Sequence, residues 1–258
     1  HIKWHSHADS PDSSQAFALS AFLPLLELSD KDAVIERFVT AALQSVPARR
    51  GRSWDLIPEF TRPELLGETG AGVPTNVDVL LVADDAVVCV ESKFRVDALE
   101  GFGKCGQFSS GTCLGFHGSG SDTKGSNSAC RLAVPDGRRA ARLYWELGGE
   151  HFRKEVFEEQ EPSSTCPFRD IYQVMRNYLL AAAFAEETGR RHYGVIGLVP
   201  MARRTAIANG VDRFRNRVLK PQLADLVAAV DYETYVDILN GSSAEAQELA
   251  GFLTDLLG

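Results

Sequence analysis

Residues 76–94 read NVDVLLVADDAVVCVESKF, and this stretch decides the fold of the chain. Two runs that are nearly all apolar flank Asp84 and Asp85, residues that commonly form turns. Branched apolar runs of this length on either side of a turn predict a β-hairpin with strands over 76–83 and 86–94. Since neither run alternates between polar and apolar residues, we expect both strands to be buried on both faces.

The register of this hairpin gathers three charged residues. If Asp84 and Asp85 form a two-residue turn, Asp78 lies directly opposite Glu91 on the neighbouring strand. Directly opposite residues project from the same face of a sheet. Lys93 follows Glu91 by two residues, so its side chain projects from that face as well. The hairpin therefore predicts a small patch of two carboxylates and one ammonium group.

Two opposed carboxylates in a buried sheet repel each other, so something must offset the repulsion. Lys93 can neutralise one of them, whereas Mg²⁺ or Mn²⁺ can neutralise both, because hard cations prefer oxygen ligands. A bound Mg²⁺ polarises a phosphoryl oxygen and lowers the pKa of a bound water. Lys93 can orient that water or stabilise the developing negative charge. A strand end held only by a salt bridge, without a metal, is the alternative reading.

The segments around the hairpin predict an α/β fold with a mixed central sheet flanked by helices. Apolar periodicity predicts helices over residues 15–28, 30–44 and 168–188, and a buried strand over 193–199. Ser29 and Asp32 resemble a capping box at the start of the second of these helices. Residues 46–72 are rich in Pro, Gly and Arg, and predict an irregular connection with at most a short strand.

The remaining segments complete one predicted domain over residues 1–258. Its core comprises residues 30–97 and 166–200. Residues 98–165 are rich in Gly, Ser and Cys, which predicts an insertion into that core. The C-terminal residues 211–258 predict helices over 211–230, 232–239 and 244–257, with a break or kink at Pro221.

Composition limits the classes of partner. A net charge of −8 argues against a general electrostatic grip on nucleic acid, although a carboxylate site needs negative charge to hold its cation. Three arginine-rich groups can still form a local basic groove: Arg49, Arg50 and Arg52; Arg138, Arg139 and Arg142; and Arg203 to Lys220.

No apolar run approaches the roughly 20 residues of a membrane span, so we expect no membrane contact. Five cysteines, an odd number, and no apolar export signal predict a reduced, cytoplasmic location.

At these residues the chain resembles a known family. Asp78 followed by Glu91-Ser92-Lys93 is similar to the signature of the PD-(D/E)XK, or restriction-endonuclease-like, nuclease superfamily. The order of elements resembles its αβββαβ core, with the first strand unclear. Further phrases resemble a bacterial subgroup of restriction endonucleases: Ser13-Ser14-Gln15, Thr75-Asn76-Val77-Asp78, Gly101-Phe102-Gly103-Lys104-Cys105 and Tyr172-Gln173-Val174-Met175-Arg176-Asn177.

The resemblance implies a divalent-metal-dependent nuclease with two supporting positions. Members often carry an acid on the first core helix that reaches the metal through water; Glu36 is the natural match and Glu68 the competitor. Many also place a polar residue on the helix after the Glu-x-Lys strand, where Gln173 and Arg176 lie. The implied catalytic set is therefore Asp78, Glu91 and Lys93 with Gln173 and Glu36. Mg²⁺ or Mn²⁺ would be held by the first two.

The cysteines outside the hairpin offer a different kind of site. Cys105, Cys113, Cys130 and Cys166 flank or lie within the predicted insertion, and four such thiols could bind Zn²⁺ or an Fe–S cluster. Their spacing contains no CxxC pair, so buried free thiols are the simpler interpretation. Cys89 lies within the second hairpin strand and is expected in the core.

We therefore expect an endonuclease that hydrolyses DNA, with RNA not excluded, in restriction, defence or DNA repair. A homodimer would suit double-strand cleavage. Two alternatives stay open: a nuclease fold with a weak metal site that only binds nucleic acid, and a cysteine-clamped Zn or Fe–S protein.

Overall fold

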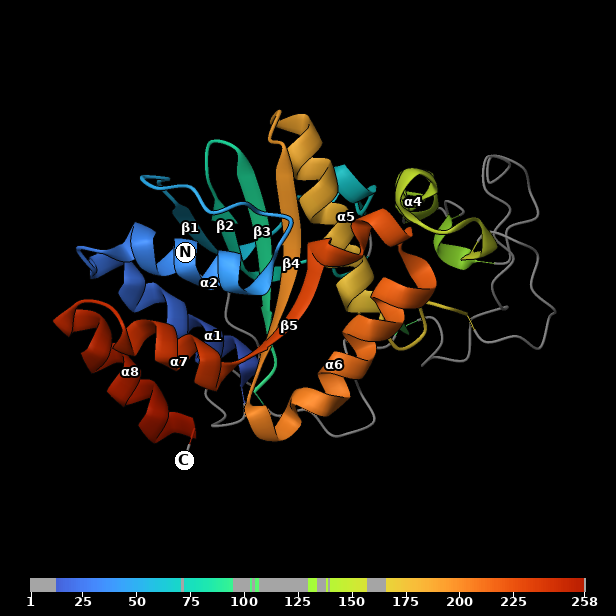
Figure 1. Ribbon diagram of the computed structural model, residues 1–258. Coiled ribbons are helices and arrows are strands. Elements are labelled where there is room, and N and C mark those ends of the chain that lie inside the picture. The colour runs from blue at the N-terminus through green and yellow to red at the C-terminus, as the bar shows by residue number, and fades with distance from the viewer. Residues whose placement is uncertain are drawn as a thin grey trace.

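A mixed five-stranded sheet forms the centre of the computed structural model (Figure 1). The structure describes residues 13–70, 72–94, 103, 105–106, 130–133, 138, 140–156 and 166–257. The strands follow one another across the sheet in sequence order: β1 (Asp55–Phe60), β2 (Val77–Val82), β3 (Ala86–Ser92), β4 (His192–Val199) and β5 (Val227–Asp231). β1, β2 and β3 pair antiparallel, whereas β3, β4 and β5 pair parallel. This arrangement confirms the mixed sheet predicted from the sequence.

The hairpin of β2 and β3 has the register predicted from its turn. Val79 pairs with Val90 and Val82 with Val87, and Ala83 donates its N–H to the carbonyl of Ala86 across the turn at 2.8 Å. Every residue of β3 is buried, because β2 and β4 flank it and helices cover both faces of the sheet. The sequence prediction of strands buried on both faces is therefore confirmed for β3.

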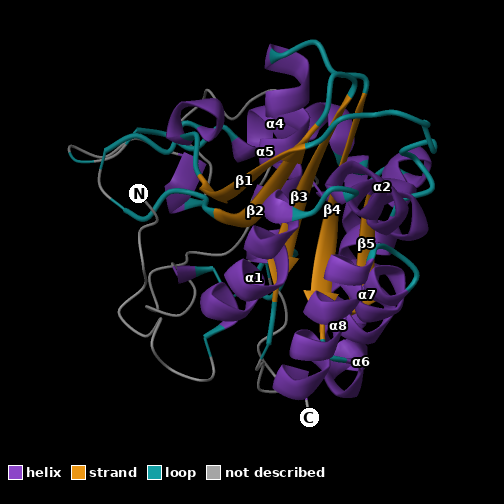
Figure 2. Cartoon of the chain, turned by 90° about the vertical axis from the view of Figure 1, so that its left-hand side faces the viewer, coloured by secondary structure: helices purple, strands orange, loops and turns teal. Residues whose placement is uncertain are grey.

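Helices cover the two faces of the sheet unequally (Figure 1). One face carries α1 (Ser14–Phe22), α2 (Lys31–Ala42), α7 (Tyr232–Asn240) and α8 (Ala244–Leu257). Figure 2 views the molecule from this side, with the strands running across it in order from β1 to β5. The other face carries α4 (Tyr144–His151), α5 (Tyr172–Glu187) and α6 (Arg204–Arg213). Along β3, Val87 and Cys89 pack on the α5 side, and Val88 and Val90 on the α1 side.

The start of α2 differs from the predicted capping box. Asp30 is the N-cap residue, and its side chain makes no capping hydrogen bond. Its carboxylate accepts instead from the N–H and hydroxyl of Ser243, at 2.9 and 2.8 Å. The Asp32 carboxylate accepts from the N–H of Trp54 at 2.9 Å. Both acids are thus used in tertiary contacts, so the capping prediction was wrong.

Residues 211–230 were predicted as helical with a break or kink at Pro221; the break is present, but residues 227–230 belong to a strand and not to a helix. α6 ends at Arg213 and continues as a π-helical turn (Phe214–Val218), and a 3₁₀ helix follows (Pro221–Leu226) before β5. Proline lacks an N–H and cannot continue the preceding helix, so the chain is free to re-enter the sheet beside β4. The predicted C-terminal helices over 232–239 and 244–257 are present as α7 and α8.

Two further predictions concern the connection before β2 and the insertion. The expected short strand within 46–72 is β1, which completes the antiparallel part of the sheet. Most of residues 98–165 lie outside the described residues; α4 is the longest described helix there. In the part of the chain that is described, no helix has both the length and the apolar content that crossing a membrane requires.

Candidate active site

The structure brings Asp78, Glu91 and Lys93 together at the open end of the hairpin, away from its turn. Lys93 donates from Nζ to Glu91 Oε1 at 2.7 Å, and only 2 % of Glu91 is exposed. Asp78 Oδ2 accepts from the N–H of Ser92 at 2.7 Å, which ties the two strands together where their regular pairing ends. The two carboxylates and the ammonium group therefore form one patch on the α5 face of the sheet.

Two side-chain amides of α5 donate hydrogen bonds to the Glu91 carboxylate. Gln173 donates from Nε2 to Glu91 Oε1 at 2.6 Å, and Asn177 donates from Nδ2 to Oε2 at 2.9 Å. The two residues are four positions apart, so they lie on one face of the helix. Asn177 is fully buried, and its Oδ1 has no hydrogen-bond partner in the described part of the chain. Sequence reasoning identified Gln173 but missed Asn177, which the i, i+4 spacing could have revealed.

Gly103 allows the chain to pass close to Gln173. The Gly103 carbonyl accepts from the N–H of Tyr172 at 3.2 Å, and a Cβ at Gly103 would lie 3.1 Å from Gln173 Cβ. Its φ of 75° falls in the left-handed region, where residues with a side chain are strained. Glycine at this position therefore permits the close approach that fixes the start of α5 over the site.

Electrostatics at the patch favour a cation. Burial raises the pKa of Asp78 well above its ordinary value, and repulsion from Glu91 adds to the rise, while Lys93 and the Ser92 N–H partly offset it. Burial alone would lower the pKa of Lys93, but the attraction of Glu91 and Asp78 outweighs it and raises that pKa. Lys93 is therefore an ammonium ion at neutral pH, and Asp78 carries its charge at a cost.

Glu68 lies close to this patch but is enclosed by protein donors. Its carboxylate accepts from the Thr75 hydroxyl at 2.7 Å, from the Thr75 N–H and from the Tyr144 hydroxyl, and it is almost fully buried. Arg176 on α5 approaches it to 3.9 Å and stacks over the Tyr172 ring. Because Thr75 immediately precedes the segment that leads into β2, Glu68 fixes the entry to the strand that carries Asp78.

Glu36 is not brought to the site. Its carboxylate accepts from Arg52 Nη1 at 2.9 Å and from the indole N–H of Trp54 at 2.9 Å, and Arg52 also binds Asp85 in the hairpin turn. Asp85 and Glu91 are six residues apart on an extended strand, which corresponds to roughly 20 Å. Glu36 thus lies at the opposite end of the hairpin from Asp78.

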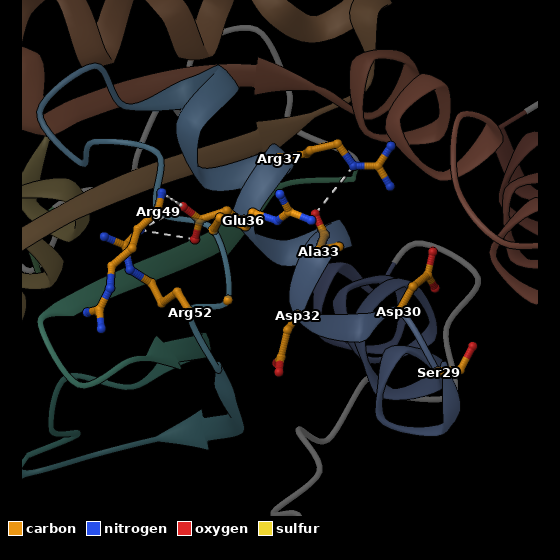
Figure 3. A pocket seen from close by; sticks show the side chains of 10 residues that line it. Ser29, Asp30, Asp32, Ala33, Glu36, Arg37, Arg49 and Arg52 are labelled. Carbon is orange, nitrogen blue, oxygen red and sulfur yellow. Dashed lines mark hydrogen bonds and ion pairs between the residues drawn. The ribbon is translucent and has the colours of Figure 1, made fainter.

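A cavity of about 420 Å³ opens beside Glu36, between α2 and the loop that carries Arg49, Arg50 and Arg52 (Figure 3). In Figure 3 the Arg49 N–H and the Arg52 side chain point to Glu36, and Arg37 points to the carbonyl of Ala33. Asp78, Glu91 and Lys93 do not line this cavity.

The donor set at the open end suits a hard divalent cation, since carboxylate oxygens are the ligands that Mg²⁺ and Mn²⁺ prefer. Asp78 has one hydrogen-bonded oxygen, and no lysine or arginine within the described ranges forms an ion pair with it. Among the residues that the structure describes, no three His, Cys, Asp or Glu side chains converge to enclose a metal. Asp78 and Glu91 would therefore be the two residues that hold a cation here.

Three of the four cysteines considered from the sequence as metal ligands are described, and the four-ligand site stays a prediction. Cys113 lies outside the described residues. Cys105 is buried and Cys130 and Cys166 are partly buried against the core on the α5 side, but these three are not arranged to hold a metal. Cys89 is a buried core residue of β3, as expected.

One arginine of each basic group binds a neighbouring residue. Arg49 binds Asp84, Arg142 donates to the carbonyl of Gly67, and Arg215 binds Asp225. The local basic groove stays a prediction.

Comparison with known proteins gave one match. A family model described as Restriction Endonuclease associating with ARP matches residues 1–255. No curated protein and no solved structure matches the chain.

Proposed function

Because the chain belongs to the family described as Restriction Endonuclease associating with ARP, we propose that it is a Mg²⁺- or Mn²⁺-dependent endonuclease acting on DNA. Membership of a restriction-endonuclease family indicates a nuclease with DNA as its substrate. One observation carries the assignment of the site: two carboxylates from paired strands and one lysine meet on one face of the sheet.

Asp78 and Glu91 would hold the cation, which when bound supplies Lewis acidity to a phosphoryl oxygen and a more acidic water. Gln173 and Asn177 keep the Glu91 carboxylate in one orientation, since each of its oxygens accepts from one of their amides. Lys93 stays protonated, because the two acids raise its pKa, so it acts as a hydrogen-bond donor and not as a base. Its ammonium group can orient the attacking water or bind a phosphate oxygen as negative charge develops there.

Cleavage of a DNA duplex by the purified chain, with and without Mg²⁺, tests this function. Asp78→Ala, Glu91→Ala and Lys93→Ala should each abolish cleavage, whereas Glu187→Ala on the exposed end of α5 should leave it unchanged. An RNA duplex in the same assay shows whether the activity extends to RNA. Persistent cleavage by purified Glu91→Ala would refute the proposal.

The geometry also supports a second candidate, a nuclease fold that binds nucleic acid with little catalysis. Both Glu91 oxygens already accept hydrogen bonds, from Lys93, Gln173 and Asn177, so a cation must compete with protein donors. Titration calorimetry with Mn²⁺ separates the two candidates. The absence of Mn²⁺ binding in a chain that still binds DNA would favour the binding module.

The cellular setting is part of the same proposal. A cytoplasmic chain that forms a homodimer would present two such sites to the two strands of a duplex. Sedimentation of the chain alone and on DNA tests this, and a purely monomeric complex would contradict the dimer.

A further inference from the structure

Lys93 lies just beyond the last residue of β3, where a side chain of α1 takes over the support of the strand. The N–H of Lys93 still donates to the carbonyl of Leu198 on β4, at 2.8 Å. One residue further, the N–H of Phe94 donates to the hydroxyl of Ser14, the first residue of α1, at 3.1 Å. Since the regular pairing of β3 ends at Ser92, Ser14 supplies the acceptor that a neighbouring strand would otherwise provide.

The side chains around Lys93 project from the two faces of the sheet in alternation. The Ser92 hydroxyl forms a hydrogen bond with the buried hydroxyl of Tyr232 on α7. The Phe94 ring stacks on the ring of Phe17 on α1, with ring centroids 4.0 Å apart. Both residues therefore project from the α1 face, and Lys93 between them projects from the α5 face, which carries the two carboxylates. Contacts on the α1 face thus fix the backbone from which the Lys93 side chain extends on the other.

One side of α1 holds both the backbone and the ring of Phe94. Ser14 and Phe17 are three residues apart, so they are neighbours on the helix surface. Phe17 is itself buried, and it packs edge-on against the tyrosine ring of α7 with centroids 4.6 Å apart. The first turn of α1 is fixed as well, since the Ser13 hydroxyl accepts from the N–H of Ala16 at 3.1 Å. The capped helix is therefore a firm support for the chain beyond β3.

We infer that Ser14 is a positioning residue for Lys93, whose ammonium group it keeps beside the two carboxylates by fixing the chain beyond β3. Displacement of a reacting group by about 1 Å can lower a rate about 100-fold, so the bond is able to affect catalysis. Ser14 acts through the lysine, whereas Asn177 acts through Glu91. The inference rests on the proposed function, and it gives a role to Ser14 within the sequence phrase Ser13-Ser14-Gln15.

Steady-state kinetics and Mn²⁺ titration of Ser14→Ala test this role. The variant should lose about 10–100-fold in kcat. Its KM for DNA and its Mn²⁺ affinity should stay unchanged, because Asp78 and Glu91 would hold the cation. Ser14→Thr keeps the hydroxyl and should restore most of the wild-type kcat. Ser45→Ala is the matched control and should cleave as wild type, because its hydroxyl also binds the backbone of a distant segment, the carbonyl of Asp225 at 3.0 Å.

Hydrogen exchange of the backbone amides tests the physical link without relying on activity. The Phe94 N–H should exchange faster in Ser14→Ala than in the wild type or Ser14→Thr, because its acceptor is removed. Unchanged exchange at Phe94 would contradict the inference.

Two kinetic outcomes would also overturn the positioning role. One is a loss of kcat in Ser14→Ala that comes with weaker Mn²⁺ binding or that Ser14→Thr shares, since either would indicate a general disturbance of the site. The other is wild-type kcat in Ser14→Ala, which would leave the proposed function intact. No DNA cleavage by the wild-type chain would remove the proposed function and this inference with it.

Discussion

The two ends of the β2–β3 hairpin carry similar acids in opposite states. At the turn, Glu36, Asp84 and Asp85 are matched by Arg49 and Arg52, whose guanidinium groups bind them at 2.8–3.4 Å. At the open end, Lys93 forms an ion pair with Glu91, and no lysine or arginine among the described residues forms one with Glu59 or Asp78.

This difference shows that counting carboxylates does not locate a cation site. The acids at the turn have their charge neutralised and their oxygens occupied, so they stabilise the fold. The acids at the open end have an excess of negative charge and an unpaired buried oxygen on Glu59, which is the condition under which a cation binds. The cavity beside Glu36 is thus a structural feature next to an ion-pair network, and the patch at Asp78 is the candidate for chemistry.

The largest effect is expected from removing the arginine that joins the acids at the turn. The Arg52 side chain is fully buried and binds both Glu36 and Asp85 at 2.9 Å, so Arg52→Ala removes the guanidinium that the two carboxylates share. We expect a loss of about 3–5 kcal/mol in the free energy of unfolding, measured by urea denaturation. Arg49→Ala, which removes a half-exposed guanidinium, should cost about 1 kcal/mol or less. Equal losses of unfolding free energy in Arg52→Ala and Arg49→Ala would contradict the central role of Arg52 at the turn.

Neutralising one acid at each end should give opposite effects on stability. Glu36→Gln weakens the bonds from Arg52 and Trp54 and should cost about 1–3 kcal/mol, with DNA cleavage retained. Asp78→Asn should leave the metal-free chain equally or more stable, because burial and Glu91 make its charge unfavourable, and should abolish cleavage. Urea denaturation and a cleavage assay on both proteins are the measurement. Loss of DNA cleavage in Glu36→Gln at unchanged stability would instead place the active site at the turn end of the hairpin, beside Glu36.

A smaller effect is expected from the amide that positions Glu91. Asn177→Ala removes the donor to Glu91 Oε2. Loss of a residue that hydrogen-bonds to a metal ligand typically lowers activity or metal affinity by about 10–100-fold. The decrease should appear in kcat and in Mn²⁺ affinity, while the KM for DNA stays unchanged. Leu180→Ala, a core substitution on the same helix, serves as a control for general loss of packing. A changed KM with normal Mn²⁺ affinity would mean that Asn177 does not act through Glu91.

The smallest effect is expected from His151, whose ring contacts two tyrosine hydroxyls and which serves as a reference for both ends of the hairpin. His151 Nδ1 lies 3.1 Å from the Tyr178 hydroxyl and 3.4 Å from that of Tyr193. Burial lowers the pKa of His151, with smaller opposing effects from neighbouring carboxylates. The unfolded chain therefore binds the proton more readily, and stability should decrease as the pH falls below the ordinary histidine value of about 6.5. Melting temperatures from pH 8 to 5 should show this decrease in the wild type and a shallower one in His151→Phe; identical slopes would contradict it.

The hairpin was predictable because local rules determine it. A two-residue turn sets the register, and the register places Asp78, Glu91 and Lys93 on one face without knowledge of any other strand. The acids beyond the hairpin were not predictable in this way. Apolar periodicity located the helix that carries Glu36, but it does not say at which end of the sheet that helix packs.

Glu59 and β5 were missed because tertiary contacts determine them. Pro58 and the left-handed Glu59 interrupt the strand pattern of β1, so no register could be extended from Asp78 to a third strand before the fold was known. The five residues of β5 follow Pro221 and a 3₁₀ helix, and pairing with β4 makes them a strand. Asn177 required only the observation that it shares a helix face with Gln173.

Crystals of the chain soaked in Mn²⁺ and measured at a wavelength where manganese scatters anomalously test the central claim most directly. We predict an anomalous peak within about 2.5 Å of an Asp78 carboxylate oxygen, and none in the cavity beside Glu36. A peak bound by Glu36, or no peak near Asp78, would contradict it.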